Sequence, residues 1–268
     1  MRVRLILGVL VASFASISSV GPQTPLQRPP AIRYVANAGV LVTVDGHRFL
    51  IDAPIRDGIQ PYATSPADER ARLESASAPY DAVDAILITH WHEDHFSPEA
   101  VAAHLARNVR AVLVSSPEVV ARVRAVAAGL PVERFRGILP APGHVEAVTV
   151  GSATVRVLRI RHNPTRRLPE QHVGFLIGEA APVLHVGDAD PAADNFVLLR
   201  GLPKVDVALL PFWYVLDDAS RRFVADAIGP RRIVAIHLPP ADAADVTRRL
   251  RAAGGNVLLP PEPGSAIR

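Results

Sequence analysis

The chain reads AILITHWHEDHFSPEA from Ala85 to Ala100. Its first four residues form a continuous apolar run, which is typical of a strand buried on both faces of a sheet. Ser97 and Pro98 are typical of the cap and the first position of a helix. The polar residues between them therefore lie on a loop at the end of a buried strand, where rigid scaffolds carry functional side chains.

Three histidines and an aspartate stand within this loop, at His90, His92, His95 and Asp94. Imidazole and carboxylate together suit zinc, iron or manganese. Because the chain has no cysteine, disulfides, thiolate ligands and cysteine nucleophiles are all excluded. Any metal must therefore be held by nitrogen and oxygen, and the loop predicts such a site.

Apolar strand patterns and helix patterns follow one another along the whole chain after the N-terminal segment. Two stacked sheets with helices outside them would use all of these elements, so we expect an α/β (α+β) fold in one domain over residues 31–268. The expected helices begin at residues 65, 97 and 116 and cover 217–228 and 243–253. The expected strands lie at 32–35, 40–44, 48–52, 84–89, 111–115, twice within 148–160, and at 174–177, 183–186, 205–210, 233–236 and 257–259.

The N-terminus has the pattern of a secretory signal peptide. Arg2 and Arg4 are followed by an uncharged apolar stretch over 5–20 and by small residues at 16–21. We expect a signal peptide at 1–21, a proline-rich linker at 22–30, and a periplasmic or secreted protein without a stable membrane span after cleavage. An uncleaved N-terminal anchor is the alternative.

The composition is that of a globular protein, with 49% hydrophobic and 21% charged residues in 268. The formal net charge is +3, Lys204 is the only lysine, and no long basic run occurs. We therefore expect a small-molecule substrate rather than nucleic acid as the partner. No feature of the sequence specifies an oligomeric state.

The string His-x-His-x-Asp-His after a strand resembles the signature of the metallo-β-lactamase superfamily. Further residues match family motifs in the same order, each at the end of an apolar strand: Asp52, His162, Asp188 and His237. The resemblance covers nearly the whole chain after the linker and implies a four-layer αββα sandwich. Residues 78–81 and 89–92 look most like the branch that contains L-ascorbate 6-phosphate lactonase and the N-acylphosphatidylethanolamine phospholipase D enzymes.

The resemblance also implies a role for each matched residue. His90, His92 and His162 would hold one divalent metal ion, and Asp94, His95 and His237 a second. Asp188 would bridge the two, which are expected to be zinc, with manganese or iron as alternatives. Two adjacent cations lower the pKa of a shared water toward about 7. The expected reaction is hydrolysis of an ester, lactone, thioester or phosphodiester bond, with Asp94 and Asp188 taking part in catalysis.

Two other functions stay open at this point. The secretion signal is compatible with a metallo-β-lactamase in the strict sense, although Asp188 is the pattern of the wider hydrolases. A non-catalytic metal-binding protein is the other alternative. The complete set of seven ligands favours the hydrolase over both.

Several residues outside the ligand set are candidates for supporting roles. Asp52 and Thr89 are expected to orient the ligating histidines. His172 lies near the third histidine in sequence and is expected to act as a general acid or to contact substrate, unless it is a polar residue at a strand start. The histidines expected to be structural are His47, His104, His144 and His185.

Two short stretches could line a substrate pocket. Trp213 and Tyr214 follow an apolar strand and could form one wall, whereas for Phe212 we prefer core packing. Arg166 and Arg167 lie in a polar stretch after His162 and could bind an anionic group of the substrate. Core packing of the aromatic residues and solvation of the arginines are the alternatives.

Overall fold

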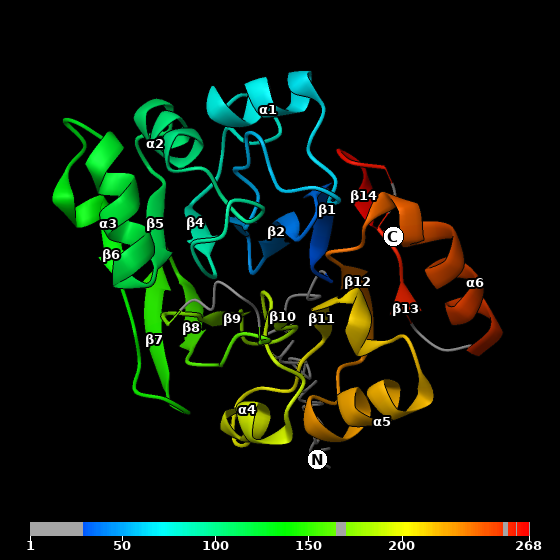
Figure 1. Ribbon diagram of the computed structural model, residues 1–268. Coiled ribbons are helices and arrows are strands. Elements are labelled where there is room, and N and C mark those ends of the chain that lie inside the picture. Colours follow the sequence, from blue (N-terminus) through cyan, green and yellow to red (C-terminus); the bar gives the residue numbers. More distant parts are fainter. Residues whose placement is uncertain (1–28, 165–169, 254–256, 261, 268) are drawn as a thin grey trace, which may run out of the picture.

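The computed structural model describes residues 29–267, with gaps at 165–169, 254–256 and 261 (Figure 1). The expected signal peptide, most of the linker, Arg166 and Arg167 lie outside the described residues. Within the described ranges, no helix has the length and apolar character needed to cross a membrane.

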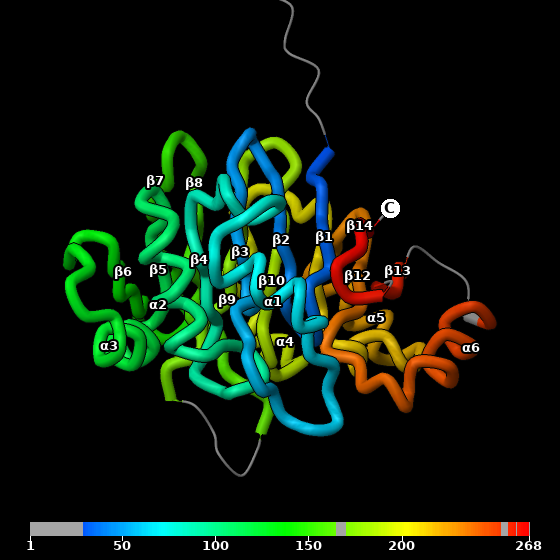
Figure 2. The backbone as a smooth tube through the Cα atoms, turned by 90° about the horizontal axis from the view of Figure 1, so that it is seen from above, coloured from blue at the N-terminus to red at the C-terminus, as the bar shows by residue number. Residues whose placement is uncertain are grey.

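Two sheets of seven strands each form the centre of the described part of the chain. The first sheet runs in the order β14 (Ala266–Ile267), β1 (Ala31–Ala36), β2 (Gly39–Val44), β3 (His47–Ile51), β4 (Ala85–Ile88), β5 (Val112–Ser115) and β6 (Phe135–Gly137). The second runs in the order β13 (Val257–Leu258), β12 (Arg232–Ile236), β11 (Val207–Pro211), β10 (Val183–His185), β9 (Gly174–Ile177), β8 (Ala153–Leu158) and β7 (Val145–Val150). Figure 2 shows β5, β4, β3, β2 and β1 side by side across the molecule.

Helices cover the outer face of each sheet (Figure 1). The first sheet is covered by α1 (Ala67–Glu74), α2 (Pro98–Arg107) and α3 (Pro117–Val126). The second is covered by α4 (Ala193–Phe196), α5 (Asp218–Ala227) and α6 (Ala243–Ala253). The expected four-layer αββα sandwich is therefore confirmed.

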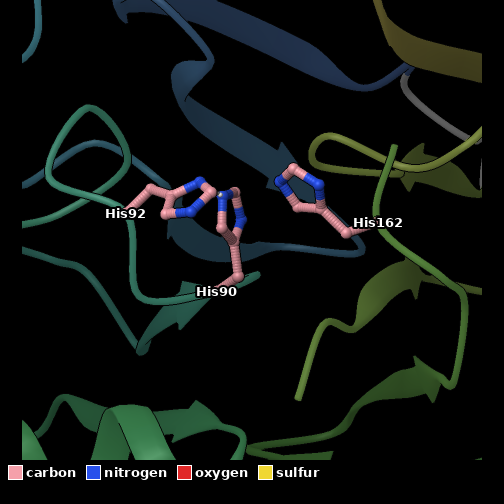
Figure 3. Close-up of side chains that lie close together, drawn as sticks. All are labelled: His90, His92 and His162. Carbon is pink, nitrogen blue, oxygen red and sulfur yellow. Dashed lines mark hydrogen bonds between the residues drawn. The ribbon is translucent and has the colours of Figure 1, made fainter. Parts of the chain in front are cut away.

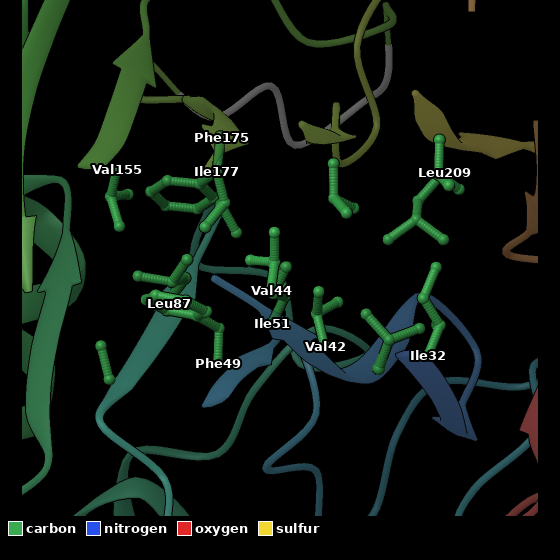
Figure 4. Close-up of a cluster of buried hydrophobic side chains, with 14 of the residues drawn as sticks. Ile32, Val42, Val44, Phe49, Ile51, Leu87, Val155, Phe175, Ile177 and Leu209 are labelled. Atoms are coloured by element: carbon green, nitrogen blue, oxygen red, sulfur yellow. The ribbon is translucent and has the colours of Figure 1, made fainter. Parts of the chain in front are cut away.

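The alternation of side chains along each strand explains these layers. Phe49 and Ile51 of β3 point between the sheets, while Leu50 points toward the helices. In the second sheet, Leu209 points between the sheets and Leu210 toward the helices. Figure 4 shows the layer between the sheets, where side chains of both interdigitate. Burying each such side chain contributes roughly 1.5–3 kcal/mol to folding.

Most of the expected elements are present, with some differences at their ends. The first helix begins at Ala67 rather than Ser65, because the Ser65 hydroxyl donates to the carbonyl of Val35 instead of capping the helix. Short elements without a clear pattern, such as β6, β14 and α4, escape prediction from sequence.

The strand directions determine where the functional loops lie. β3 and β4 are parallel, as are β10, β11 and β12. β8 runs in the direction of β10, because both are antiparallel to β9. The carboxyl ends of β3 and β4 in one sheet and of β8, β10 and β12 in the other therefore carry the loops that hold the matched residues.

Candidate metal centre

Each residue matched in the sequence follows the carboxyl end of a strand. Asp52 directly follows β3, and the His90–His95 loop follows β4. In the second sheet, His162, Asp188 and His237 follow β8, β10 and β12. His162 also forms an isolated bridge with Ala189, which holds the β8 and β10 loops side by side. Residues from both sheets thus meet at one end of the sandwich.

The structure brings all seven expected ligands together in three overlapping groups. In each group the candidate ligand atoms lie within 4.8 Å of one another, and every member is buried. Figure 3 shows the rings of His90, His92 and His162 gathered around one space. The groups are His90, His92 and His162; His90, His95 and Asp188; and Asp94, His95 and His237.

Asp188 lies between the outer two groups. One carboxylate oxygen is 3.3 Å from Nε2 of His95, and the other is 3.2 Å from Nε2 of His237. The second oxygen is also 3.8 Å from Nε2 of His162. Asp94 approaches the same region, with Oδ2 at 3.1 Å from Nε2 of His237. Asp188 is therefore the carboxylate placed to serve both outer groups.

The donor atoms fit divalent cations. Nε2 of His95, Nε2 of His162 and Oδ1 of Asp188 are buried and have no hydrogen-bond partner among the described residues. Buried polar atoms without partners are uncommon, because each one loses its hydration without compensation. Imidazole nitrogens and carboxylate oxygens aimed at a shared space are suitable ligands for zinc, manganese or iron.

Asp52 and Thr89 hold two of the histidines in place, as the sequence led us to expect. Asp52 Oδ1 accepts from the Thr89 amide at 2.8 Å, and its Oδ2 accepts from the Thr89 hydroxyl at 2.6 Å. His95 Nδ1 also donates to Asp52 Oδ2, at 2.9 Å. Because the Thr89 hydroxyl donates to Asp52, it accepts from His90 Nδ1, at 3.0 Å. Both rings therefore direct Nε2 toward the centre.

Asn37 is a supporting residue that sequence reasoning missed. It lies in the turn between β1 and β2, fully buried, with a positive φ of 48°. Its side-chain amide donates to Asp94 at the backbone oxygen (3.0 Å) and at Oδ2 (3.2 Å). Its backbone oxygen accepts from the His237 amide at 3.0 Å. An asparagine between two strands resembles an ordinary turn residue, so no local signal reveals this role.

His172 lies beside the centre with both ring nitrogens bonded to the backbone. Nε2 accepts from the Asp188 amide at 3.2 Å, so Nδ1 carries the proton and donates to the Ile160 carbonyl at 3.1 Å. Burial, followed by the charge of His162, lowers the pKa of His172 to about 3. This geometry fits a residue that positions Asp188 and differs from the expected general acid, which needs a free ring nitrogen toward the substrate.

Gly187 permits the close approach of these supporting residues. Its φ is +56°, and a Cβ at this position would lie 2.6 Å from the Thr89 hydroxyl oxygen and 2.7 Å from His172 Nε2. Any side chain here would displace one of the two, so the backbone just before Asp188 requires glycine.

The electrostatic environment differs between the two outer groups. For His90, burial followed by the charge of His95 lowers the pKa well below its ordinary value, and burial lowers that of His162 to about 4. For His95 and His237, burial acts in the same direction, but nearby carboxylates, with Asp188 foremost, outweigh it. The pKa of His95 is held well above its ordinary value, and that of His237 is raised to about 9.

A cleft of about 360 Å³ opens onto the centre and is lined by His92, Asp94, His162, Asp188 and His237. Trp213 lines it, as expected, with its ring centroid 5.3 Å from that of His237.

The expectation for Tyr214 is wrong. Tyr214 is fully buried and donates its hydroxyl to the Ala189 carbonyl, because the 3₁₀ turn Phe212–Tyr214 directs neighbouring side chains differently. Phe212 packs partly buried against the outer core.

The histidines expected to be structural lie outside the ligand groups. His185 is buried, accepting from the Gly187 amide at Nδ1 and donating from Nε2 to the Ala38 carbonyl. His104 is buried in α2 and donates from Nδ1 to the Leu73 carbonyl. His47 contacts the Ser152 hydroxyl, and the exposed His144 contacts the carbonyl of Pro142.

Comparison with known proteins agrees with this geometry. The profile of the beta-lactamase superfamily domain matches residues 47–258, which include every candidate ligand. The chain belongs to this family. A UPF0173 protein of Pyrococcus abyssi is 30% identical over 211 residues, or 77% of this chain and 82% of that protein. A UPF0173 metal-dependent hydrolase of Caldivirga maquilingensis is 27% identical over 209 residues, or 77% of this chain and 81% of that protein.

A solved structure shows the same fold. A possible metal-dependent hydrolase of Veillonella parvula superimposes with a TM-score of 0.64 at 19% identity, covering 89% of this chain and 98% of that one. Taken with the family match, these similarities show a metal-dependent hydrolase of the metallo-β-lactamase fold.

Proposed function

We propose that the centre holds two divalent metal ions and that the protein hydrolyses a carboxylic ester, lactone, thioester or phosphodiester. The observation that carries the proposal is the meeting of five imidazoles and two carboxylates in three overlapping groups around Asp188. A single structural metal site is closed by four ligands and would not need seven. When bound, such a pair of ions supplies an acidified water and a Lewis acid for the electrophile.

The residues of the chain have distinct tasks in this proposal. Asp188 contacts His237 in one outer group and His162 in the other, and would serve both ions. Asp94 and Asp188 are the carboxylates that line the cleft, so they are placed to accept a proton from the attacking water. His172, through its bond to the Asp188 amide, would fix the direction of that carboxylate.

The open cleft favours catalysis over metal storage. A centre used only to bind metal needs no opening for another molecule, whereas this cleft reaches ligands of both outer groups. The carboxylate at position 188, rather than a thiolate, favours the wider hydrolases over a β-lactamase in the strict sense.

The proposal is tested by elemental analysis together with an activity panel. The protein is loaded with zinc, manganese or iron and assayed with a p-nitrophenyl ester, a γ-lactone, a thioester, bis-p-nitrophenyl phosphate and a chromogenic cephalosporin. We expect two equivalents of metal and hydrolysis of at least one of the first four. Full metal occupancy with no turnover would favour the non-catalytic alternative, and fast hydrolysis of the cephalosporin alone would favour the β-lactamase.

A further inference from the structure

The cleft beside the centre has apolar walls that come from both halves of the molecule. Ile59 and Tyr62 lie on the segment between β3 and α1, which belongs to the first sheet. Trp213 lies in the turn after β11 of the second sheet. These three residues line the same cleft as Asp94, Asp188 and His237.

Two of these walls contact one candidate ligand. The Tyr62 ring lies edge-on to His237 with centroids 4.2 Å apart and planes at 71°. The Trp213 ring meets the same imidazole at 5.3 Å and 70°. Both rings are therefore adjacent to a residue that would hold one of the metal ions. Ile59 is bound into the same turn, since the Tyr62 amide donates to its carbonyl, and it leaves 37% of its surface exposed.

The charged side chains of the cleft are its carboxylates, Asp94 and Asp188. Among the described residues that line it, no lysine or arginine occurs. Recognition of phosphate or carboxylate ordinarily uses arginine or lysine, and among the described residues such side chains line the neighbouring cavity, at Arg159 and Arg161. In that cavity Arg161 forms two hydrogen bonds to Asp194, whereas Nη1 of Arg159 has no hydrogen-bond partner among the described residues.

We propose that Ile59, Tyr62 and Trp213 form a subsite for an apolar group, so that the preferred substrates are esters or lactones carrying an alkyl or aryl chain. The inference rests on the proposed hydrolase function and narrows its substrate class. An aromatic wall next to a metal-binding histidine excludes water from the site. It also binds an apolar part of the substrate through the hydrophobic effect.

Selectivity for chain length tests the subsite. We compare kcat/KM for p-nitrophenyl octanoate and p-nitrophenyl acetate in the metal-loaded wild-type protein and in Trp213→Ala. The wild type should prefer octanoate, and Trp213→Ala should lower this preference about tenfold, which is the size of effect expected from lost apolar contacts. Trp213→Phe keeps an aromatic wall and should keep most of the preference. Equal preference in wild type and Trp213→Ala would overturn the proposal.

A matched pair of aliphatic variants controls for general surface effects. Ile59→Ser removes an exposed apolar side chain from the cleft, and Val126→Ser removes one, 44% exposed, from the end of α3. Only Ile59→Ser should reduce the preference for octanoate. An equal effect of both variants would contradict a local subsite.

A binding measurement separates the subsite from the catalytic proposal. Isothermal titration of the metal-loaded protein with octanamide and acetamide measures apolar recognition without turnover. We expect tighter binding of octanamide in the wild type and about tenfold weaker binding in Trp213→Ala. If this holds while no ester is cleaved, the subsite stands and the hydrolytic proposal fails. If octanamide binds no better than acetamide, the subsite is wrong whatever the enzyme hydrolyses.

Discussion

The two outer ligand groups lie on either side of Asp188, but the chain builds them differently. His90, His92 and His162 are three imidazoles, and burial keeps the pKa of His162 near 4. The other group contains a carboxylate, Asp94, and the pKa of His237 is raised to about 9. One position is therefore a neutral nitrogen site and the other a charged mixed site. Two ions bound there would differ in affinity and in preference for oxygen ligands.

The supporting contacts differ in the same way. His90 in the neutral group is held through the neutral hydroxyl of Thr89, and His162 through the Asn163 carbonyl at 2.5 Å. In the charged group, His95 is held directly by the Asp52 carboxylate and Asp94 by the Asn37 amide. A carboxylate behind a histidine makes the ring a more basic ligand. The comparison therefore predicts two positions that can be disturbed separately.

Asp188→Ala should have the largest effect, because Asp188 is the carboxylate next to both groups. We expect loss of metal from both positions and a fall in kcat/KM of more than about a hundredfold. Removal of a hydrogen bond that only supports a ligand costs up to about a hundredfold, and Asp188 would be a ligand itself. Metal content by mass spectrometry and the most active ester measure this. Asp190→Ala, two residues further and outside the groups, is the control. Retention of one full equivalent of metal would assign Asp188 to a single group.

Gly187→Ala should come next, because it displaces supports of both groups at once. The added methyl approaches the Thr89 hydroxyl and His172 Nε2, so we expect a loss of stability of about 3 kcal/mol together with weaker metal binding. Gly143→Ala is the matched control, since its φ is also positive, at +74°, but its Cβ would meet no atom within 4 Å. It should cost only about 1 kcal/mol. Urea unfolding compares the two, and equal losses would show that backbone strain alone matters.

Asn37→Gly should affect the charged group alone. Glycine accepts the positive φ without strain, so the variant removes only the amide that holds Asp94. We expect the affinity of one metal position to fall about ten- to a hundredfold while the other is unchanged. Thr89→Val, by contrast, removes a hydroxyl that contacts both His90 and the Asp52 carboxylate behind His95, and should weaken both positions. Competition with a chromophoric chelator resolves the two affinities, and an equal fall at both positions in Asn37→Gly would contradict the asymmetry.

His104→Gln should give the smallest effect. This variant allows a buried histidine far from the carboxylates to be compared with the histidines of the centre. Burial lowers the pKa of His104 below its ordinary 6.5. The unfolded chain therefore takes up this proton first as the pH falls below 6.5, and stability is lost by up to about 1.4 kcal/mol per pH unit. Urea unfolding of the metal-free protein between pH 7.5 and 5 should show a shallower decline in His104→Gln. Identical slopes would remove His104 from the acid response.

The resemblance to the metallo-β-lactamase superfamily supplied the seven candidate ligands, and the structure brings them together on loops that follow strands with clear apolar patterns. The strand ends place His90, Asp188 and His237 at one edge before any contact is known. Asn37 and Tyr62 could not be found in this way. Asn37 reaches Asp94 across 57 positions, and Tyr62 reaches His237 from an irregular segment. Their roles depend on how the two sheets pack together, which no local pattern encodes.

Tyr214 illustrates the opposite error. Three consecutive aromatic residues suggested a single wall, with Trp213 and Tyr214 together on the pocket. In a 3₁₀ turn successive side chains point about 120° apart. Trp213 therefore lines the cleft, while Tyr214 is buried against Phe196 and Phe223. Predicting which aromatic residue faces the substrate required the turn type, and Pro211 indicates only that the strand ends there.

The supply of ligands from both sheets has a mechanical consequence. Asp94 and His95 belong to the first half of the chain, and Asp188 and His237 to the second. Ions held between them would act as a cross-link between the two sheets, at the end of the sandwich that carries these loops. Chelation should then speed hydrogen exchange at the ends of β4 and β12 before it affects the strands around Phe49. The supply of metal ions would in that case determine how stably the two sheets are held together at this end.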